Sequence, residues 1–425
     1  MPTFLVQGGR RLHGTVRPAG NKNAALPMMA AALLTEEPVL LENVPRIRDV
    51  ETMSELIAAL GASVEWVGDG ALRITAKTLG PSELDPALAA RIRASILLAG
   101  PMLARAGRLN LPPPGGDVIG RRRLDTHFLA LQALGAEIEA AETYQLRAKA
   151  LAGAEVFLDE PSVTATENAV MAATLARGTS VLRNVAAEPH VQQLCRLLIA
   201  MGARIRGIGG HELVIEGVDR LHGASARVDP DHIEVGSFIG LAAVTGSELA
   251  VAPVEARHLD AIRLGFARLG LYCELKGTTL RVPAEQSLEI QMDFGERVPK
   301  IDDGPWPAFP ADLVSIATVV ATQCRGTILI HEKMFESRLF FVDKLVSMGA
   351  RIVLCDPHRA VVVGPSPLRG AEVESPDIRA GMAMLIAALG AEGTSRIHNI
   401  GQIERGYEAI EARLRALGAE IERRD

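Results

Sequence analysis

The sequence predicts an α/β protein of two domains, each built from three copies of one repeated unit. A chain of 425 residues is too long for one ordinary hydrophobic core. A helical pattern that ends in Leu-Gly or Met-Gly also recurs six times, with glycines spaced 67 to 79 residues apart. Six copies of this length fit two domains of three units better than a solenoid. The six glycines are Gly61, Gly135, Gly202, Gly270, Gly349 and Gly418.

Each unit is predicted to hold two helices and three strands. The helix before each glycine is amphipathic, as Met53, Leu56 and Leu60 show in the first copy. The glycine ends this helix, and a hairpin follows. About thirty residues earlier lies a helix that is apolar nearly all round, as in segments 23–34 and 379–389, and is therefore expected to be buried. A short strand between the helices gives the order helix, strand, helix, strand, strand.

The two ends of the chain are predicted to belong to the same domain. The first helix begins at Lys22, so the strands expected within residues 3–19 have no helix before them. We expect these strands to complete the last unit. This predicts an N-terminal domain of residues 22–229 and a C-terminal domain of residues 1–21 and 230–425.

Composition narrows the classes of function. The net charge of −6 argues against general nucleic-acid binding, and no apolar run approaches the length that spans a membrane. No spacing of residues suggests a metal site. The four cysteines form no CxxC pair, and the N-terminus has too short an apolar run for a signal peptide. We therefore expect a cytoplasmic protein with reduced, packed thiols at Cys195, Cys273, Cys324 and Cys355.

The stretch LPPPGGDVIGRRRLDTH, residues 111–127, has the features of a mobile lid, expected over 111–123. Three prolines stiffen its beginning, and Gly115 and Gly116 then free the backbone. Asp117 follows directly, and three arginines come soon after it. A carboxylate on a glycine hinge beside three guanidinium groups suits a lid over an anionic substrate. Taken alone, the stretch could equally be a surface loop with a solvated basic cluster.

Polar residues gather at two places in every unit. One set stands at the start of the first helix, and the other in the loop before the second helix. If the units are alike, both sets lie at the same end, where helix N-termini favour anions. The first set is Lys22 with Asn23, Arg91 with Arg93, Ser162 to Asn168, Asp231 with Glu234, Asp312, and Asp377 with Arg379. The second is Arg46 with Asp49, Asp117 to Asp125, Glu188, Arg257 with Asp260, Glu336 with Arg338, and Glu404 with Arg405.

At these residues the chain resembles the enolpyruvyltransferase family, from end to end. The resemblance rests on several motifs together: AGNKNAALP, RASILLAGP, PGGDVIGRRRLDTH, DPDHIEVGSF, PAFPADL, FESR and ERGYEAIE. It implies two inside-out α/β barrel-like domains of three units each, with the active site in the cleft between them. This agrees with the six repeats read from the sequence.

Within the family, the chain is most similar to members that begin bacterial peptidoglycan synthesis, a step needed for cell shape and division. The resemblance implies transfer of the enolpyruvyl group of phosphoenolpyruvate to the 3-hydroxyl of UDP-N-acetylglucosamine. Phosphate leaves by addition and then elimination, without metal or organic cofactor. Such chemistry needs a base for the hydroxyl, an acid for the vinyl carbon, and cations around the donor. No protein partner is implied.

The resemblance also assigns roles to residues at matching positions. Lys22, Arg122 and Arg405 match the clamp on phosphoenolpyruvate, and Asp117 the proton donor on the lid. Asp312 matches the carboxylate near the accepting hydroxyl, where a helix cap is the alternative. The remaining matches are further cations of the site at Arg93, Arg338 and Arg379, a sugar contact at Asn23, the wall around the uridine at Arg122, Arg123, Leu124, Asp125 and His127, and the diphosphate site at Ser162 and Val163. For His127, a packed ring is an equal alternative.

Three positions depart from the family pattern. Asp117 replaces the usual cysteine, whose thiolate the epoxide fosfomycin alkylates, so we expect insensitivity to fosfomycin. Glu160 and Thr164 replace a common lysine and glycine near the expected diphosphate. These changes leave open another nucleotide or sugar acceptor. A non-catalytic protein that binds a UDP-sugar is a further alternative. An enzyme acting on shikimate 3-phosphate is disfavoured because the chain lacks a GNAGT-like loop.

Overall fold

The computed structural model describes residues 2–80 and 82–424. The chain divides into two compact units. Unit 1 comprises residues 1–19, 118–121 and 230–425, and unit 2 comprises residues 20–117 and 122–229. Each unit has its own hydrophobic core. The tip of the expected lid, Val118–Arg121, is therefore grouped with unit 1, whereas the rest of the lid belongs to unit 2.

Unit 2 contains three copies of the predicted repeat. The first has α1 (Lys22–Ala31), η1 (Ala32–Leu34), β3 (Val39–Glu42), α2 (Arg48–Ala59), β4 (Ser63–Gly68) and β5 (Ala71–Thr75). The second has α3 (Pro86–Ala89), η2 (Arg93–Leu98), α4 (Ala99–Ala106), β6 (Arg108–Leu111), α5 (Asp125–Ala133), β7 (Glu137–Ala140) and β8 (Tyr144–Arg147). The third has β9 (Glu155–Phe157), α6 (Val163–Ala173), β10 (Thr179–Arg183), α7 (Pro189–Ala200), β11 (Arg204–Arg206) and β12 (Glu212–Glu216), and β13 (Ser225–Arg227) follows it.

Unit 1 contains the other three copies. The fourth has α8 (His232–Thr245), β14 (Glu248–Val251), η3 (Ala256–His258), α9 (Asp260–Ala267), β15 (Glu274–Lys276) and β16 (Thr279–Val282). The fifth has β17 (Lys300–Asp302), η4 (Ala311–Leu313), α10 (Val314–Gln323), β18 (Gly326–His331), α11 (Val342–Ser347), β19 (Arg351–Asp356) and β20 (Arg359–Gly364). The sixth has β21 (Glu372–Glu374), α12 (Ile378–Gly390), β22 (Thr394–His398), η5 (Ile403–Arg405), α13 (Ile410–Ala416) and β23 (Glu420–Arg424).

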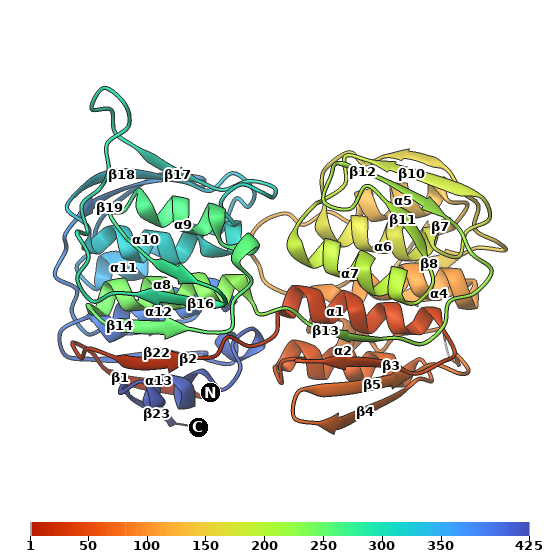
Figure 1. Ribbon diagram of the computed structural model, residues 1–425, viewed down its shortest axis with the longest axis horizontal. Helices are drawn as coiled ribbons and strands as arrows, with labels where there is room; N and C mark the ends of the chain where they lie inside the picture. The colour runs from red at the N-terminus through yellow and green to blue at the C-terminus, as the bar shows by residue number, and fades with distance from the viewer. Residues whose placement is uncertain (1, 81, 425) are drawn as a thin grey trace. The chain divides into compact units, whose positions relative to one another are not determined.

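The repeat predicted from the sequence is confirmed, and its architecture is inside-out. The first helix of each copy is buried on nearly every face, as in α1, α6, α8, α10 and α12. In unit 1, α8, α10 and α12 pack against one another, and the sheets lie around them (Figure 1). A helix that is apolar on all sides can bury its whole surface only in such a central position.

The six repeat glycines lie where the amphipathic helices end. Each has a positive φ, from 75° at Gly270 to 104° at Gly202 and Gly349. Because glycine has no Cβ, it adopts this left-handed conformation without steric cost and lets the chain turn back into a hairpin. The spacing of the glycines therefore reveals the repeat, because each amphipathic helix needs a residue of positive φ at its end.

Most sheets contain one strand that the sequence reading missed. The described residues form five four-stranded sheets and one three-stranded sheet. Within each four-stranded sheet, one short edge strand runs parallel to the strand that follows the first helix, as β9 does beside β10 and β17 beside β18. These strands have only three or four residues, which is too short for a recognisable alternation of apolar and polar side chains.

The expectation for the opening strands is right for one strand and wrong for the other. β1 (Thr3–Gln7) pairs antiparallel with β22 and β23 and completes the sixth repeat. β2 (His13–Val16) instead pairs parallel with β14 of the fourth repeat. In unit 2, β13 pairs parallel with β3 in the same way. In both units, therefore, the last strand before the chain passes into the other unit forms one edge of a sheet. This sheet belongs to the first repeat of the unit, which is β3 to β5 in unit 2 and β14 to β16 in unit 1.

The apolar pattern of segment 93–104 predicts one helix, and this prediction is wrong. Residues 93–98 form a 3₁₀ helix, and α4 begins at Ala99. Pro101 cannot donate to the carbonyl of Leu97, and its ring crowds that carbonyl, so the preceding turn winds differently. Among the cysteines expected to be packed, Cys195, Cys273 and Cys324 are buried, but Cys355 is exposed. Cys355 lies between Leu354 and Asp356, where the pairing of β19 with β20 shifts register.

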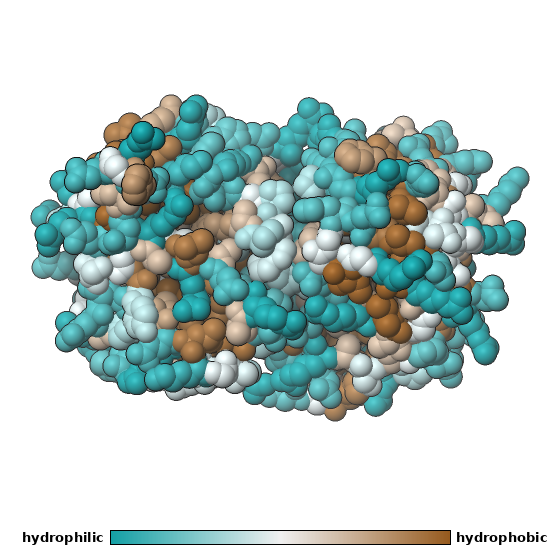
Figure 2. Space-filling model, turned by 45° about the horizontal axis from the view of Figure 1, so that its top comes forward, coloured by the Kyte–Doolittle hydropathy of each residue, from teal (hydrophilic) through white to brown (hydrophobic). Residues whose placement is uncertain are grey.

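Because most apolar side chains lie in the two cores, the surface is expected to be mainly polar. The face shown in Figure 2 is largely hydrophilic, and its hydrophobic side chains lie in separate small groups. Within the described ranges, no helix combines the length and hydrophobicity needed to cross a membrane. Nor do those ranges contain a group of three or more His, Cys, Asp or Glu side chains that could hold a metal ion.

Candidate active site

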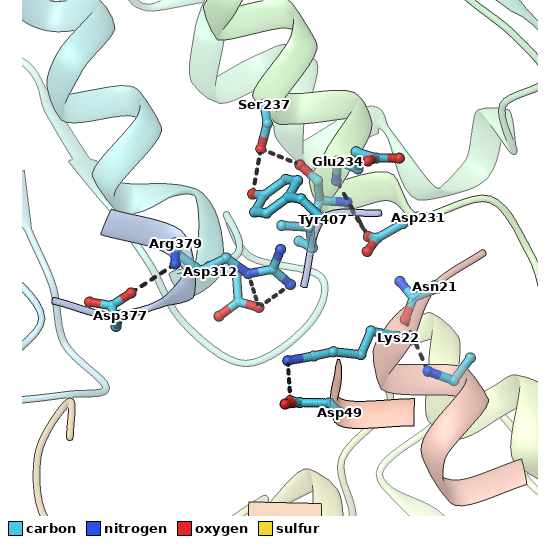
Figure 3. Close-up of polar contacts among 12 residues, drawn as sticks. Asn21, Lys22, Asp49, Asp231, Glu234, Ser237, Asp312, Asp377, Arg379 and Tyr407 are labelled. Carbon is cyan, nitrogen blue, oxygen red and sulfur yellow. Dashed lines mark hydrogen bonds and ion pairs between the residues drawn. The ribbon is translucent and has the colours of Figure 1, made fainter. Parts of the chain in front are cut away.

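Lys22 occupies the first position of α1 in unit 2 and is held by a carboxylate. Asn21 caps this helix, because its side-chain oxygen accepts the N–H of Ala24 at 3.0 Å. The ammonium Nζ of Lys22 lies 3.1 Å from Oδ2 of Asp49, which belongs to the first turn of α2 (Figure 3). Both side chains are largely buried. A buried ion pair fixes the direction of the ammonium group at a helix N-terminus that itself favours anions. Asn23, the next residue, is half-buried.

Arg93 contacts the lid on both sides of its tip, at Gly116 and at Arg122 with Arg123. Its Nη2 donates to the carbonyl oxygens of Arg122, at 2.5 Å, and Arg123, at 3.0 Å. On the other side, Gly116 packs so closely on Arg93 that a Cβ on Gly116 would lie 2.9 Å from the Arg93 Cβ. Burial and the charge of Arg122 lower the pKa of Arg93 to about 10. Arg93 therefore remains a cation at neutral pH. Because it contacts both Gly116 and Arg122, it holds these two parts of the lid close together.

The lid residues themselves are partly accessible. Asp117 is half-buried, and the neighbouring Val118 is 91% exposed. Beyond the lid, Arg123 forms ion pairs with Asp159 and Asp125. Asp159 also accepts a hydrogen bond from the Thr126 hydroxyl at 2.6 Å. The guanidinium of Arg123 is thus oriented by two carboxylates of its own unit.

His127 is a buried ring next to the start of α6. Its Nε2 lies 2.9 Å from the hydroxyl of Thr164, and its side chain is 1% exposed. Burial, followed by the charge of Arg93, lowers the pKa of His127 to about 3. With a pKa this far below its ordinary value, the ring is neutral at physiological pH. Ser162 is the N-cap residue of α6 and Val163 its first residue, so both border the free N–H groups of this helix.

The burial of His127 predicts a pH dependence of stability. Between pH 6.5 and about 3, the unfolded chain protonates this histidine and the folded chain does not. Protons therefore favour unfolding in this window, so the contribution of His127 destabilises the fold as the pH falls. In His127→Gln, which keeps a polar group near Thr164, the decline in the free energy of unfolding below pH 6.5 should be shallower. Urea titrations of both proteins between pH 7 and pH 5 measure it, and equal slopes would contradict the prediction.

In unit 1, Asp312 accepts from two buried guanidinium groups. Nη2 of Arg338 lies 3.1 Å from Oδ1. Nε and Nη2 of Arg379 lie 3.1 and 3.0 Å from Oδ2 (Figure 3). Both arginine side chains are 4% exposed, and the Asp312 side chain is 26% exposed. Asp312 is not a helix cap, since η4 and α10 have no side-chain cap bond. It is a partly exposed carboxylate, and each of its two oxygens is oriented by an arginine.

The start of α12 supports this group. Asp377 caps the helix by accepting the N–H groups of Arg379 and Ala380 at 2.8 and 2.9 Å. Burial opposes the charge of Arg379, but Asp312, Tyr407 and Asp231 outweigh it and raise the pKa of Arg379 above its ordinary value. Burial also raises the pKa of Asp231 to about 6, although Arg379 opposes that shift.

Arg405 lies in η5 and is half-buried. Its Nη1 donates to Oε1 of Gln402 at 2.8 Å, which directs the side chain within its own turn. Within unit 2, the predicted residues lie at Lys22 on α1, at Arg93 with the lid, and at the start of α6. Within unit 1, they lie at Asp312 with its two arginines and at Arg405 in η5.

Sequence reasoning missed several supporting residues. Tyr407 is buried, and its hydroxyl lies 2.9 Å from Ser237 (Figure 3). Asp303 and Glu332 are buried carboxyls near Arg338. Each of the last two directly follows a strand, but β17 and β18 end in Asp302 and His331, so no apolar run marks either residue. For Tyr407, the only signal is its place in the ERGYEAIE motif.

Comparisons with known proteins place the chain among enolpyruvyl transferases. The family described as EPSP synthase (3-phosphoshikimate 1-carboxyvinyltransferase) matches residues 6–414. The chain is 64% identical over 420 residues to the UDP-N-acetylglucosamine 1-carboxyvinyltransferase of Bradyrhizobium diazoefficiens, covering 99% of this chain and 97% of that protein. It is 56% identical over 422 residues to the protein of the same name from Treponema denticola, covering 99% of each.

Solved structures agree on the fold. The enolpyruvyl transferase NikO from Streptomyces tendae superposes with a TM-score of 0.89 at 23% identity, covering 100% of this chain and 99% of that one. EPSP synthase from Acinetobacter baumannii superposes with a TM-score of 0.76 at 17% identity, covering 100% of both chains. At these identities the likeness concerns the fold alone.

Proposed function

This chain belongs to the EPSP synthase family, and we propose how its residues carry out the transfer of an enolpyruvyl group. The reaction moves this group from phosphoenolpyruvate to the 3-hydroxyl of UDP-N-acetylglucosamine, releases phosphate, and begins peptidoglycan synthesis. The observation that carries this reading is the identity of 64% to an enzyme of that name across nearly the whole of both chains. At such identity the chemistry of an active site is ordinarily retained.

Asp312 is proposed as the base that removes the proton of the accepting hydroxyl. Its two oxygens are oriented by Arg338 and Arg379, and its remaining exposed surface leaves room for a hydroxyl. Asp117 is proposed as the acid that protonates the vinyl carbon, in place of the cysteine usual in the family. Its position after Gly116 lets the lid bring it to the donor and remove it again.

The donor is proposed to bind Lys22, Arg122 and Arg405, with Arg93, Arg338 and Arg379 adding positive charge. Phosphoenolpyruvate carries a phosphate and a carboxylate, and charge-assisted hydrogen bonds are the strongest contacts available to both groups. Lys22 already points away from its helix toward a carboxylate at 3.1 Å, so an anion can compete for it. Because these residues come from both units, we propose that both units contribute to one site.

The acceptor is proposed to lie against the α6 terminus and the end of the lid. The N–H groups in the first turn of α6, which Ser162 and Val163 border, suit the diphosphate. Asn23 is proposed to contact the sugar, and Arg122, Arg123, Leu124, Asp125 and His127 to wall the uridine. His127 and Thr164 then act as a pair, because Thr164 orients the neutral ring. Oε1 of Glu160 lies 3.3 Å from the Thr126 hydroxyl, whose single proton goes to Asp159 at the shorter distance of 2.6 Å.

Two properties follow from the proposed site. With a carboxylate at position 117, we propose that the enzyme is insensitive to fosfomycin. We also propose that it works in the cytoplasm, where its four free cysteines would stay reduced.

Phosphate release from phosphoenolpyruvate tests this function. Release should require UDP-N-acetylglucosamine and proceed without added metal. Release with a different nucleotide sugar, but not with this one, would identify another acceptor. Tight binding of UDP-N-acetylglucosamine without release would indicate a non-catalytic protein, and release with shikimate 3-phosphate would indicate the sister activity.

Arg405→Ala should raise the KM for phosphoenolpyruvate by roughly 10- to 100-fold, since a charge-assisted hydrogen bond to the donor is lost. The KM for UDP-N-acetylglucosamine should change little. Arg424→Ala, on the exposed edge strand β23, is a matched control that removes the same charge elsewhere in unit 1. An unchanged KM and kcat in Arg405→Ala would remove this residue from the donor clamp.

A further inference from the structure

Two buried carboxyl groups meet where neighbouring strands end. β17 and β18 run parallel with Asp302 opposite His331, so the residues that follow, Asp303 and Glu332, lie side by side. Asp303 is 1% exposed and Glu332 is fully buried. Two ionised carboxylates in such a place would repel each other without water to screen them. One of the two therefore has to be held in its neutral form.

Of the four carboxyl oxygens, two accept backbone N–H groups and two have no donor among the described residues. Oδ1 of Asp303 accepts the N–H of Lys333 at 2.5 Å. Oε1 of Glu332 accepts the N–H groups of Met334 and Phe335 at 3.2 and 3.1 Å. Oδ2 of Asp303 and Oε2 of Glu332 are buried and have no donor among the described residues. A single proton between these two oxygens would satisfy both, because a carboxylic acid donates and a carboxylate accepts.

The surrounding charges are consistent with a proton on Glu332. Burial, followed by the contact with Asp303, raises the pKa of Glu332, and the guanidinium of Arg338 opposes this only in part. The other titratable group facing it is His358, whose Nδ1 lies 2.7 Å from the Glu332 carbonyl oxygen rather than from its carboxyl group. Lys333 directs its ammonium group to Asp302 instead.

Glu332 also organises the loop that delivers Arg338. Its Oε1 accepts from the backbone of the first turn, and Arg338 follows a few residues later, with its guanidinium over the Phe335 ring at 5.0 Å. Nε of Arg338 lies 3.7 Å from Oε2 of Glu332, and Nη2 reaches Asp312 at 3.1 Å. The acid pair thus stands on one side of Arg338 and the proposed base on the other.

We propose that Asp303 and Glu332 form an acid pair sharing one proton, and that this pair positions Arg338 and, through it, Asp312 for the transfer. The inference rests on the proposed function, because it concerns the orientation of the proposed base. Both residues are positioning residues, since neither touches the substrate in this scheme. A neutral Glu332 leaves the full charge of Arg338 to Asp312, whereas an ionised Glu332 would draw the guanidinium away.

Amide substitutions test the shared proton because each single change keeps one donor facing one acceptor. Glu332→Gln places an NH2 group against Oδ2 of Asp303, and Asp303→Asn places one against Oε2 of Glu332. In the double variant two NH2 groups face each other and neither is satisfied. We expect each single variant to keep kcat within about threefold of wild type, and the double variant to lose roughly 10- to 100-fold. The KM for phosphoenolpyruvate should stay within about threefold throughout.

A matched control separates this pairing from the mere loss of two charges. Asp302→Asn combined with Glu332→Gln also introduces two amides, but Asp302 lies on the other side of the strand and contacts Lys300 and Lys333. This control should behave like Glu332→Gln alone. Thermal unfolding of every variant reports whether the double variant is folded. If it is not, Glu332→Gln decides by itself, because a neutral residue at 332 is tolerated only where Glu332 carries the proton.

The outcomes are distinct. A loss in Glu332→Gln as large as that in the double variant would show that Glu332 acts as an ionised partner of Arg338, and would overturn the inference. Equal activity of the double and single variants would overturn it as well. A loss that appears in the KM for phosphoenolpyruvate rather than in kcat would contradict action through Asp312. Failure of the proposed function is recognised separately, because wild-type protein would then release no phosphate with UDP-N-acetylglucosamine.

Discussion

Asp312→Ala should lower kcat by ~10²–10⁴-fold, with a much smaller effect on the binding of UDP-N-acetylglucosamine. A group that removes a proton contributes mainly in the transition state, so its loss appears in turnover. Arg338 and Arg379 already orient both carboxylate oxygens, which means that the group is held in place before the substrate arrives. Such preorganisation is the condition under which a base is effective.

The alanine variant also leaves two buried arginines without their shared carboxylate, so folding has to be measured with activity. Asp312→Asn is the matched variant, because it keeps the size and one acceptor for Arg338 but cannot take the proton. We expect both variants to lose turnover, and the asparagine variant to unfold at the higher temperature of the two. Initial rates of phosphate release and calorimetric binding of UDP-N-acetylglucosamine provide the two readouts. Near-normal turnover in Asp312→Asn would reduce Asp312 to a structural anchor for its arginines.

The second large effect concerns fosfomycin. The native protein should keep its activity when incubated with this epoxide, and Asp117→Cys should lose activity with time. A thiolate is a strong nucleophile, whereas a carboxylate in the same place is a weak one. Because Asp117 is half-buried and next to an exposed residue, the reagent can reach the position in either protein. The difference therefore measures nucleophilicity rather than access.

The same pair of proteins tests the acid role of position 117. A proton donor has to be protonated during part of the cycle, and free aspartic acid loses its proton near pH 3.9, against about 8.5 for free cysteine. Activity of the native enzyme should therefore fall at lower pH on the alkaline side than activity of Asp117→Cys. Val118→Cys, at the exposed next residue of the lid, is a control for adding a thiol nearby. Covalent inactivation of the native protein at Asp117 would contradict the first expectation, and superimposable alkaline limbs the second.

The sequence was sufficient for the repeat and the family. Leu-Gly and Met-Gly signals are local, since each reports a helix that needs a left-handed residue at its end, and all six glycines have positive φ. The all-round apolar helices likewise require a central place, and α8, α10 and α12 occupy it in unit 1. These features depend on neighbours within a few residues, which is why they can be read without a structure. The site residues carried over from the family, such as Arg405 and Asp117, remain predictions.

Only the tertiary structure decided which residues pair over long distances. β2 pairs with β14 of the fourth repeat rather than with the last repeat. This pairing depends on where the chain passes from one unit into the other, which no local pattern shows. Asp312 is oriented by Arg379, which lies 67 residues away in another repeat. Asp303 and Glu332 meet because two parallel strands end at the same edge. No local pattern encodes these contacts, since they arise only when whole repeats pack together. Burial then determines which side chains stay ionised and where two carboxyl groups have to share a proton.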